Sequence, residues 1–359
     1  MSRPLKVAQV APLYESVPPK LYGGTERVVA NLTQGLIEQG HEVTLFASGD
    51  SITGARLISG CEQGLRLDKE IQDPVAFHAR QLDVAISMEK EFDIIHFHTD
   101  YLHFPLLKYM KTPALTTVHG RLDLKEVVSL YRRFKLDAAL TSISYAQRAP
   151  LTDNHWAGNV YHGLPLGLFK PVYKKGSYLA FLGRISPEKG LDRAIDIAKR
   201  LNMPLKVAAK IDKADQDYFE QHIKDLMEDP LVEYVGEIAE ARKEAFLGNA
   251  MGLLFPINWP EPFGMVLIES MACATPVLAF KMGSAREVVD DGASGILVES
   301  VEEAVARAPE LFKLDRRKVR EVFERRFDQE TMTRNYIKIY QELINESKQA
   351  EYFEEAAFL

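Results

Sequence analysis

The stretch that decides the fold is residues 5–46, which read LKVAQVAPLYESVPPKLYGGTERVVANLTQGLIEQGHEVTLF. Residues 5–10 form a short apolar run typical of a buried strand, and a polar loop with proline and glycine follows. Residues 25–39 carry apolar side chains at helical spacing and end before a glycine, and 43–46 predict the next strand. Strand, long loop, helix and strand together make the βαβ unit of a parallel sheet.

The same alternation continues along the chain. In the first half the pattern predicts further strands at 94–97, 114–118, 139–143 and 160–161 and helices at 75–91 and 125–134. From about Ser177 onward it predicts strands at 178–182, 205–209, 232–235, 252–255 and 277–279 and helices at 190–201, 215–227, 243–249 and 265–272. Such alternation is typical of parallel sheets with helices on both faces, so we expect an α/β fold.

The chain is long enough for two domains. Its 359 residues exceed one ordinary core, and the segment 164–176, which contains proline and glycine, is the natural linker. We therefore expect two Rossmann-like, doubly wound domains at 1–165 and 166–334 that face each other across a cleft, with ligand at the carboxyl ends of their strands. The tail is helical from 329, and we expect its segment 335–359 to pack back on the first domain, with its apolar end docked on a surface.

Composition and charge exclude several classes of protein. The sequence has 44 Lys+Arg against 51 Asp+Glu, a net charge of -7 that lacks the basic excess of a general nucleic-acid binder. No apolar run approaches the roughly 18 residues of a membrane-spanning helix, and the N-terminus leads into a strand rather than a signal peptide. The two cysteines, Cys61 and Cys273, cannot staple a secreted scaffold, so we expect buried reduced thiols in a cytoplasmic protein.

A glycine pair stands before the first helix, in the sequence Tyr22-Gly23-Gly24-Thr25-Glu26. Without Cβ atoms this backbone can approach a ligand closely, and the helix behind it offers free N–H groups and the positive end of its dipole, which suits a phosphate. A plain turn is the alternative. The GxGxxG fingerprint of dinucleotide-binding proteins is absent from this loop, so NAD binding is not indicated.

Two cations, Arg184 and Lys189, lie between the predicted strand 178–182 and the helix 190–201. Arginine offers a planar fork for phosphate oxygens and lysine a point charge, so the two can bind an anionic ligand together. The alternative is two solvated surface cations. Their position at the carboxyl end of a strand favours a binding site.

Two acids frame the start of the helix 265–272, in the segment from Glu261 through Pro262-Phe263-Gly264 to Glu269. Residues 264–266 should form a helix N-terminus, which binds anions. Eight residues along a helix span roughly 12 Å, which is too far for the paired carboxylates of a retaining glycosidase at roughly 5 Å. The two acids therefore fit hydroxyl groups at different parts of one extended ligand, a ribose at Glu269 and a sugar at Glu261. A surface acid and a helix-capping acid are the alternatives.

Three further features have competing interpretations, and metal binding is considered for two of them. His96 and His98 lie on one face of a strand, but no third ligand has a suitable spacing, so hydrogen bonding in the fold or to an acceptor is favoured over a metal. His119 follows the strand 114–118, and this place favours a ligand site over a satisfied core histidine. The segment 215–217 has the DxD form of a metal site, yet aspartate at a helix start is commonly a cap.

Taken together, the Gly23-Gly24 loop, the segment from Arg184 to Lys189 and the segment from Glu261 to Glu269 resemble glycosyltransferase family 4. The resemblance runs over nearly the whole chain, and the spacing of three separate motifs makes it specific. It implies a GT-B fold, with an acceptor-binding domain followed by a donor-binding domain. It also implies a retaining enzyme that uses a nucleotide-sugar donor.

The resemblance implies a role for each position in the phosphate-binding part of the donor site. Gly23 and Gly24 match the family's loop at the donor phosphate. Arg184 and Lys189 match the pair of cations that binds the diphosphate, and Lys210 is a weaker match for a donor contact.

The resemblance also implies contacts to the sugar and the base. Glu261 matches the acid that binds donor-sugar hydroxyls, and His119 matches the histidine beside that sugar. Glu269 matches the ribose-binding acid, and Ile238 falls where the family's backbone meets the base. Backbone contacts to sugar and phosphate are implied for Phe263, Gly264, Met265 and Val266. The chain departs from the family in having His162-Gly163 where many members have Asn-Gly before the linker.

The expected reaction moves a hexose from a nucleoside diphosphate sugar to an acceptor hydroxyl. Side-chain cations and a helix end can offset the charge of the leaving diphosphate, so no metal and no cofactor is expected. UDP-glucose is the preferred donor, with GDP- and ADP-sugars as alternatives, and the acceptor is a saccharide, a lipid-linked sugar or a small molecule. No protein nucleophile is identifiable.

Two other functions share these motifs. They are a nucleotide-sugar epimerase of GT-B fold, which would release nucleoside diphosphate without an acceptor product, and a non-catalytic sugar-nucleotide-binding protein. The intact catalytic set of His119, Arg184, Lys189 and Glu261 argues against the second. Basic residues near Tyr109, Tyr131 and Phe134 could touch a membrane surface, but a solvated helix face is favoured, with peripheral membrane contact at most.

Overall fold

The structure, a computed structural model, describes residues 3–20 and 23–357, apart from the side chains of 351 and 354–357. The predictions for Tyr22 and for the side chains of 356–359 concern groups outside this description. Tyr352 and Phe353, the described part of the apolar C-terminal segment, are each 69% exposed, so they do not dock on a surface of the chain as expected. The chain divides into two compact units. The first comprises Met1–Gly163 and Gln329–Leu359, and the second comprises Leu164–Asp328.

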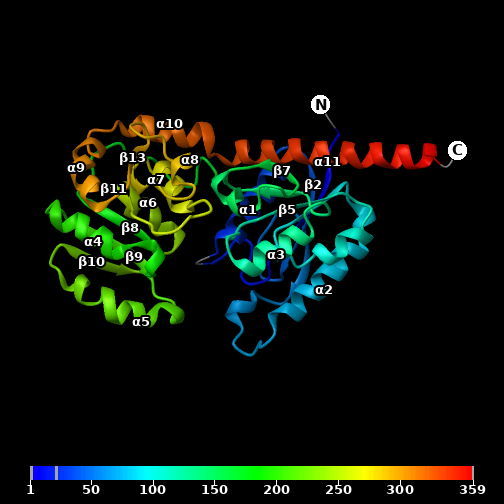
Figure 1. The fold of residues 1–359 in the computed structure, drawn as a ribbon, viewed down its shortest axis with the longest axis horizontal. Coiled ribbons are helices and arrows are strands. Elements are labelled where there is room, and N and C mark those ends of the chain that lie inside the picture. The colour runs from blue at the N-terminus through cyan, green and yellow to red at the C-terminus, as the bar shows by residue number, and fades with distance from the viewer. Residues whose placement is uncertain (1–2, 21–22, 358–359) are drawn as a thin grey trace. The chain divides into compact units, whose positions relative to one another are not determined.

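The first unit is built on a parallel sheet whose strand order is β3-β2-β1-β4-β5-β6-β7 (Figure 1). Its strands are β1 (Lys6–Val10), β2 (Glu42–Ser48), β3 (Arg56–Cys61), β4 (Ile94–Phe97), β5 (Ala114–Thr117), β6 (Leu140–Ser142) and β7 (Trp156–Asn159). Its helices are α1 (Gly24–Glu38), α2 (Pro74–Ser87), α3 (Lys125–Arg133) and α11 (Gln329–Ala357). The central strand β1 pairs in parallel with both β2 and β4, so the strand order reverses beside it. Ligands of open α/β sheets bind at such a reversal.

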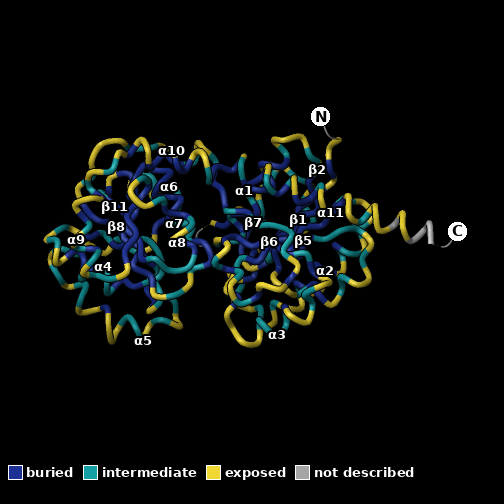
Figure 2. Tube along the Cα trace, turned by 45° about the horizontal axis from the view of Figure 1, so that its top comes forward, coloured by how far each residue is buried: buried dark blue, intermediate teal, exposed yellow. Residues whose placement is uncertain are grey.

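The second unit repeats this design with the strand order β10-β9-β8-β11-β12-β13. Its strands are β8 (Tyr178–Arg184), β9 (Leu205–Lys210), β10 (Val232–Gly236), β11 (Ala250–Phe255), β12 (Val277–Phe280) and β13 (Gly295–Val298). Its helices are α4 (Leu191–Arg200), α5 (Gln216–Tyr218), α6 (Glu240–Gly248), α7 (Met265–Ala272), α8 (Ala285–Val288), α9 (Val301–Leu311) and α10 (Arg316–Arg326). Figure 2 shows that the central strands of each sheet are buried. The expected α/β fold of two Rossmann-like domains is therefore confirmed.

Three expectations about single elements are wrong. The strand predicted at 160–161 is absent, because β7 ends at Asn159. The edge strands β3 and β13 and the helices α9 and α10 were not predicted. The helix predicted at 215–227 is instead α5, a π-helical turn at Phe219–Ile223 and a 3-10 turn at Asp225–Glu228. The apolar residues Phe219, Ile223, Leu226 and Met227 still pack on one side against the core, so the spacing identified the buried face but not the change of turn type.

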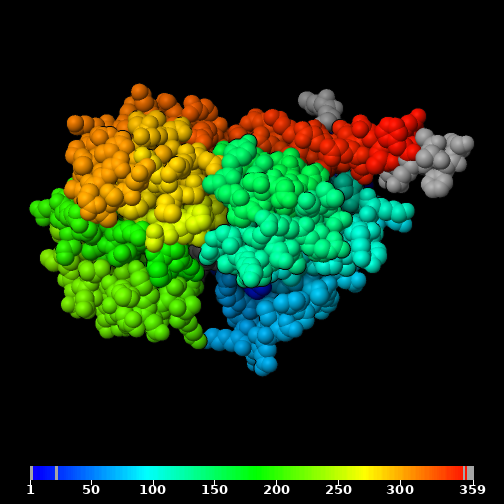
Figure 3. All heavy atoms as spheres, viewed as in Figure 1, coloured from blue at the N-terminus to red at the C-terminus, as the bar shows by residue number. Residues whose placement is uncertain are grey.

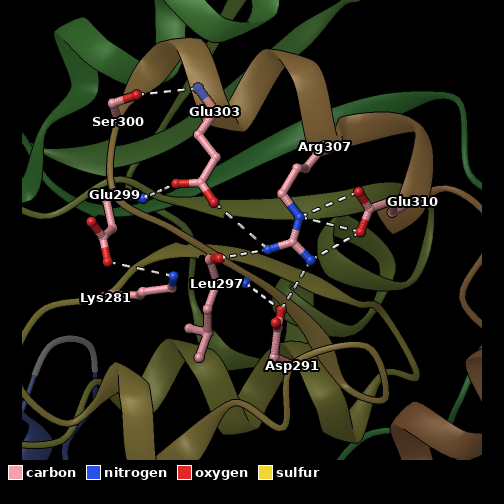
Figure 4. A network of polar contacts seen from close by, with 8 residues as sticks. All are labelled: Lys281, Asp291, Leu297, Glu299, Ser300, Glu303, Arg307 and Glu310. Atoms are coloured by element: carbon pink, nitrogen blue, oxygen red, sulfur yellow. Dashed lines mark hydrogen bonds and ion pairs between the residues drawn. The ribbon is translucent and has the colours of Figure 1, made fainter.

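The helix α9 is tied to the sheet by polar contacts around Arg307 (Figure 4). Ser300 caps the helix start by accepting a hydrogen bond from the Glu303 N–H at 3.1 Å. Arg307 donates to the Leu297 carbonyl of β13 at 2.9 Å and pairs with Glu310 at 2.9 Å. These contacts hold the last strand of the second sheet against its covering helix.

The C-terminal helix α11 packs on the first unit because two glycines make room for it. A Cβ atom at Gly35 of α1 would lie 2.2 Å from Thr333 Oγ1, and one at Gly158 of β7 would lie 2.4 Å from Ile339 Cδ1. The inward face of α11 includes the fully buried rings of Tyr336 and Tyr340. Figure 3 shows its opposite face at the surface of the first unit.

The aromatic residues near the basic segment of the first unit do not form one exposed patch. Tyr131 is buried in a core cluster and Phe134 packs against the same cluster, whereas Tyr109 is 71% exposed. This arrangement supports a solvated helix face. No helix in the described part of the chain is long and apolar enough to span a membrane.

Both cysteines are buried and unpaired. Burial raises the pKa of the Cys61 thiol to about 11 and that of Cys273 to about 12. Both thiols therefore stay protonated and unreactive at neutral pH, as expected for structural cysteines.

Candidate functional site

In the second unit, two predicted site cations stand at adjacent strand ends. Arg184 ends β8 and Lys210 ends β9, and the strand register places the two residues opposite each other. The Arg184 guanidinium pairs with Glu188 and lies 3.4 Å from Asp215 and 3.7 Å from Asp212. Lys210 Nζ lies 2.7 Å from Asp212. The sequence did not indicate these carboxylate partners.

This pairing changes the electrostatics expected for the site. Two cations share three carboxylates, so an incoming phosphate competes with negative charges that are already in place. Arginine has five N–H donors and lysine three, so each can hold a phosphate oxygen while keeping another partner. Asp215, the first residue of the DxD segment, is engaged with Arg184.

Lys189 and Glu261 form the second part of the site. Lys189 Nζ pairs with Oε2 of Glu261, and the indole N–H of Trp259 donates to the same oxygen at 3.0 Å. The Lys189 ammonium also lies 5.0 Å from the centre of the Trp259 ring. Glu261 Oε2 is therefore held twice, while Oε1 accepts no hydrogen bond from the described residues and can receive one from a ligand.

The loop that carries Glu261 is fixed by close backbone contacts. Gly283 has φ +52°, and a Cβ atom there would lie 2.4 Å from the Glu261 nitrogen. Ser284 donates its N–H to the Glu261 carbonyl at 3.0 Å and its hydroxyl to the Phe263 carbonyl at 2.8 Å. Only glycine at 283 allows the backbone of the Glu261 loop to approach so closely.

The helix α7 begins directly after this loop. Its N-cap is Gly264, with φ +77°, and no side chain caps the helix start. Met265 and Val266 make its first turn. The phenyl ring of Phe263 is buried, so this residue can offer a ligand only its backbone.

Further along α7, Glu269 is nearly buried and has one cation beside it. Its Oε1 lies 2.7 Å from Lys243 Nζ of α6. Ile238 is buried in the loop between β10 and α6. One carboxylate oxygen of Glu269 is therefore occupied by lysine, and the other can accept a ligand hydroxyl.

In the first unit, His119 follows β5 and belongs to a buried chain of hydrogen bonds. His119 Nε2 lies 2.9 Å from His98 Nδ1, and His98 Nε2 lies 2.7 Å from Oε1 of Gln9. The Gln9 amide N–H donates to the hydroxyl of Tyr340 on α11 at 2.9 Å. We call these residues the Gln9–His98–His119 relay.

His96 belongs to the neighbouring branch of this network. Its Nδ1 lies 2.7 Å from the Tyr340 hydroxyl and its Nε2 lies 2.7 Å from Thr117 Oγ1. Burial lowers the pKa of His96 and of His98 well below the usual value, so both rings are neutral. Hydrogen bonds inside the protein engage both ring nitrogens of each, which agrees with the non-metal interpretation. Among the described residues no group of three or more His, Cys, Asp or Glu side chains could hold a metal ion.

Hydrogen bonds also hold the backbone on both sides of His119. The Gln147 amide donates to the carbonyls of Val118 at 2.9 Å and Gly120 at 2.8 Å, one on each side of His119. The ring of His162, the residue that departs from the family pattern, stacks on His119 with centroids 5.4 Å apart.

The glycine loop also lies in the first unit. A Cβ atom at Gly23 would lie 2.7 Å from Pro19 and 3.1 Å from Oε2 of Glu26, whereas one at Gly24 would meet no neighbour among the described residues. Burial raises the pKa of Glu26. Glycine at 23 is therefore explained by packing, and glycine at 24 is left open to a ligand.

Comparison with known proteins identifies the chemistry that this arrangement serves. Residues 22–152 match the family described as Glycosyltransferase Family 4, and residues 169–328 match the family described as Glycosyl transferases group 1. The two matches cover most of each unit. The chain belongs to the family 4 glycosyltransferases. It is therefore a transferase enzyme, as the sequence motifs predicted.

Relatives support this assignment along most of the glycosyltransferase. An uncharacterized glycosyltransferase of Methanocaldococcus jannaschii is 27% identical over 70% of this chain and 76% of its own. A phosphatidyl-myo-inositol mannosyltransferase of Mycolicibacterium smegmatis is 24% identical over 82% of this chain and 81% of its own.

Solved structures share the fold of this glycosyltransferase. AviGT4, a glycosyltransferase involved in avilamycin A biosynthesis, matches with a TM-score of 0.74 and 24% identity, covering 95% of this chain and 98% of its own. HepE of Anabaena, in complex with UDP and glucose, matches with a TM-score of 0.73 and 16% identity, covering 94% and 100%. The fold is GT-B, as the resemblance implied.

Several side chains of this glycosyltransferase contact the candidate residues without a signal in the sequence. Trp259 and Gly283 shape the environment of Glu261, and Lys243 pairs with Glu269. In the first unit, Gln9 bonds to His98 and Gln147 holds the backbone on both sides of His119. None of the five belongs to a motif with a fixed spacing, so only their positions in space connect them to the site.

Proposed function

We propose that this glycosyltransferase moves a hexose from a nucleoside diphosphate sugar, with UDP-glucose as the first candidate, to an acceptor hydroxyl with retention of configuration. The main observation behind the proposal is that Lys189 forms an ion pair with Glu261 Oε2 and Trp259 donates a hydrogen bond to the same oxygen. Because both contacts are to Oε2, Glu261 Oε1 is left for a sugar hydroxyl. Lys189, next to it, can bind the diphosphate. The structure of HepE with UDP and glucose supports the choice of donor.

The cations of the second unit supply the chemistry at the leaving group. Departure of the nucleoside diphosphate develops negative charge on its phosphate oxygens, which Arg184, Lys189 and Lys210 can stabilise in place of a metal ion. Arg184 exchanges a carboxylate contact for a phosphate oxygen when the donor binds. The acceptor hydroxyl attacks from the face of the leaving group, and the departing phosphate oxygen takes its proton. No protein nucleophile takes part in this scheme.

The remaining residues position the donor. Glu261 Oε1 and His119 receive hydroxyl groups of the sugar, and Glu269 receives those of the ribose. The backbone at Ile238 meets the base. Gly24 and the backbone of 263–266 approach the sugar and phosphates, with Gly23 supporting the glycine loop.

The acceptor is a saccharide, a lipid-linked sugar or a small molecule with a free hydroxyl. The mannosyltransferase relative is named for a lipid, phosphatidyl-myo-inositol, so lipid-linked acceptors are among the first compounds to test. We place the reaction in the cytoplasm, which the two buried unpaired cysteines support.

A thermal-shift screen of UDP-, GDP- and ADP-sugars tests the donor, followed by hydrolysis and transfer assays with the sugar that stabilises most. We expect UDP-glucose to give the largest shift and turnover to persist in EDTA. Loss of turnover in EDTA would refute metal independence. Stabilisation by no nucleotide sugar would refute the donor site.

A matched pair of variants tests the role of Lys189. Lys189→Met should lower kcat/KM at least about tenfold, since removing one donor to a developing oxyanion costs about 3–4 kcal/mol. Lys206→Met is the control, because Lys206 lies near the other end of β9 and pairs with Glu233 at 2.8 Å. Equal activity of the two variants would contradict the assignment.

A further inference from the structure

The Gln9–His98–His119 relay has a definite direction. Gln9 places its amide nitrogen on the Tyr340 hydroxyl and its amide oxygen on His98 Nε2. An amide oxygen only accepts hydrogen bonds, so the proton of this contact belongs to His98 Nε2. The other nitrogen of the neutral His98 ring, Nδ1, is then an acceptor.

The same reasoning extends to the next ring. His98 Nδ1 lies 2.9 Å from His119 Nε2, so Nε2 of His119 must be the donor in this contact. Burial lowers the pKa of His119 to about 3, so the ring carries only this one proton at neutral pH. His119 Nδ1 is therefore a bare acceptor.

That acceptor has no partner inside the protein. His119 Nδ1 is buried and makes no hydrogen bond among the described residues. Buried polar atoms are nearly always satisfied, so an unsatisfied one calls for an explanation. A hydroxyl group of a bound ligand can donate one hydrogen bond to such an acceptor.

We propose that Gln9 and His98 are positioning residues that hold His119 as the Nε2–H tautomer, so that its Nδ1 accepts a hydrogen bond from a hydroxyl of the transferred sugar. The proposal rests on the proposed function for the identity of that hydroxyl, but the tautomer itself does not depend on it. Gln147 holds the backbone on both sides of His119 and leaves the ring little freedom to turn away.

The relay also gives the C-terminal helix a part in the site. Tyr340 of α11 accepts the hydrogen bond that fixes the Gln9 amide, across 331 positions of sequence. In the opposite amide orientation, Gln9 would donate to His98 Nε2 and every proton along the relay would reverse. Tyr340→Phe removes the hydroxyl to which the Gln9 amide N–H donates.

Nitrogen-15 NMR of histidine-labelled protein measures the tautomer directly and needs no substrate. We expect His119 to be protonated on Nε2 and bare on Nδ1 in the unliganded enzyme, with its signals assigned by their loss in His119→Ala. His98→Leu should give a mixture of tautomers. His155→Leu, at an exposed histidine of the first unit, is the control. A proton on His119 Nδ1 in the unchanged enzyme would overturn the proposal.

Kinetics separate positioning from folding. His98→Leu should lower kcat/KM by about 10- to 100-fold, the range for removing the second partner of metal-binding histidines. His98→Asn should recover most of this loss, because its side-chain oxygen can stand where His98 Nδ1 stands. If His98→Leu fails to fold, His98→Asn and Gln9→Leu allow the same comparison. Unchanged tautomer and unchanged kcat/KM in these variants would overturn the proposal.

Deoxy analogues of the donor identify the hydroxyl. In the unchanged enzyme, one analogue that lacks a single sugar hydroxyl should lose about tenfold or more in kcat/KM, the cost of one hydrogen bond to an unpaired acceptor. That loss should shrink in His98→Leu, because the two changes remove the same interaction. Equal losses in both enzymes would overturn the hydroxyl contact while leaving the NMR result to stand alone.

Discussion

Replacing Lys243 by methionine tests whether the ion pair between Lys243 and Glu269, the residue proposed to bind the ribose, stabilises the fold. Glu269 is 6% exposed, and its Oε1 lies 2.7 Å from Lys243 Nζ, whose side chain is 21% exposed. Methionine keeps much of the length of lysine and removes the charge. The variant therefore leaves the Glu269 carboxylate in place without its cation.

The size of the effect follows from this burial. Removing one partner of a fully buried pair costs about 3–5 kcal/mol. The lysine here is partly exposed and water screens the interaction, so we expect about 2 kcal/mol. For a unit of this size that lowers Tm by about 4–8 °C. Glu269→Gln in the same protein should restore most of the lost stability, because the uncompensated charge is then gone.

Thermal unfolding followed by circular dichroism measures the cycle of single and double variants. Lys224→Met is the control, since Lys224 pairs with Glu220 at 2.7 Å on an exposed helical segment and should leave Tm unchanged. Titration with UDP completes the assay, where Glu269→Gln alone should weaken binding by about 1.5–3 kcal/mol. A Lys243→Met protein that unfolds at the original temperature, or a double variant that is less stable than either single one, would refute the reasoning.

Three further predictions concern the supports of the site. Gly283→Ala should lower kcat/KM at least about tenfold, because the new Cβ would lie 2.4 Å from the Glu261 nitrogen and displace the loop that carries Glu261. Unchanged kinetics would show that the position of this loop is unimportant. Arg316→Met should cost at least about 3 kcal/mol in urea unfolding, because the buried guanidinium donates to four carbonyls and to Thr275 Oγ1; a loss below half of that would contradict this. Unfolding free energy should fall as the pH drops from 7.5 to 5.5, because burial lowers the pKa of several histidines, most strongly those of His96, His98, His103, His119 and His162. Below about pH 6.5 these histidines take up protons in the unfolded chain but stay neutral in the folded protein. The loss of unfolding free energy therefore approaches about 1.4 kcal/mol per histidine per pH unit. Equal stability at both pH values would exclude this contribution.

The sequence predicted the fold better than it predicted single elements. Alternating apolar runs identified both parallel sheets, because the period of buried side chains is written locally in each strand and helix. The prediction of one helix at 215–227 is wrong because apolar residues at helical spacing identify a buried face but do not reveal where the backbone will change to wider or narrower turns. The strand predicted at 160–161 was misplaced by a few residues, since β7 covers Trp156–Asn159 and Val160 adds only one backbone hydrogen bond, to the Ser142 carbonyl at 2.9 Å.

The candidate site was predicted in its residue types but not in its pairing. Arg184 and Lys189 stand at the carboxyl end of a strand as expected, but their ion pairs with Glu188 and Glu261 were not predicted. His98 was interpreted as a hydrogen-bonding residue, which the structure bears out, but its partner Gln9 was not expected.

What the sequence determined by itself was the order of strands and helices and the kinds of charged group at strand ends, since these depend on neighbours within a few residues. The tertiary structure decided which atoms meet, such as Gln9 with Tyr340 and Lys189 with Glu261. Hydrogen bonds and ion pairs act over about 3 Å, and only the packing of distant segments brings their partners within that reach.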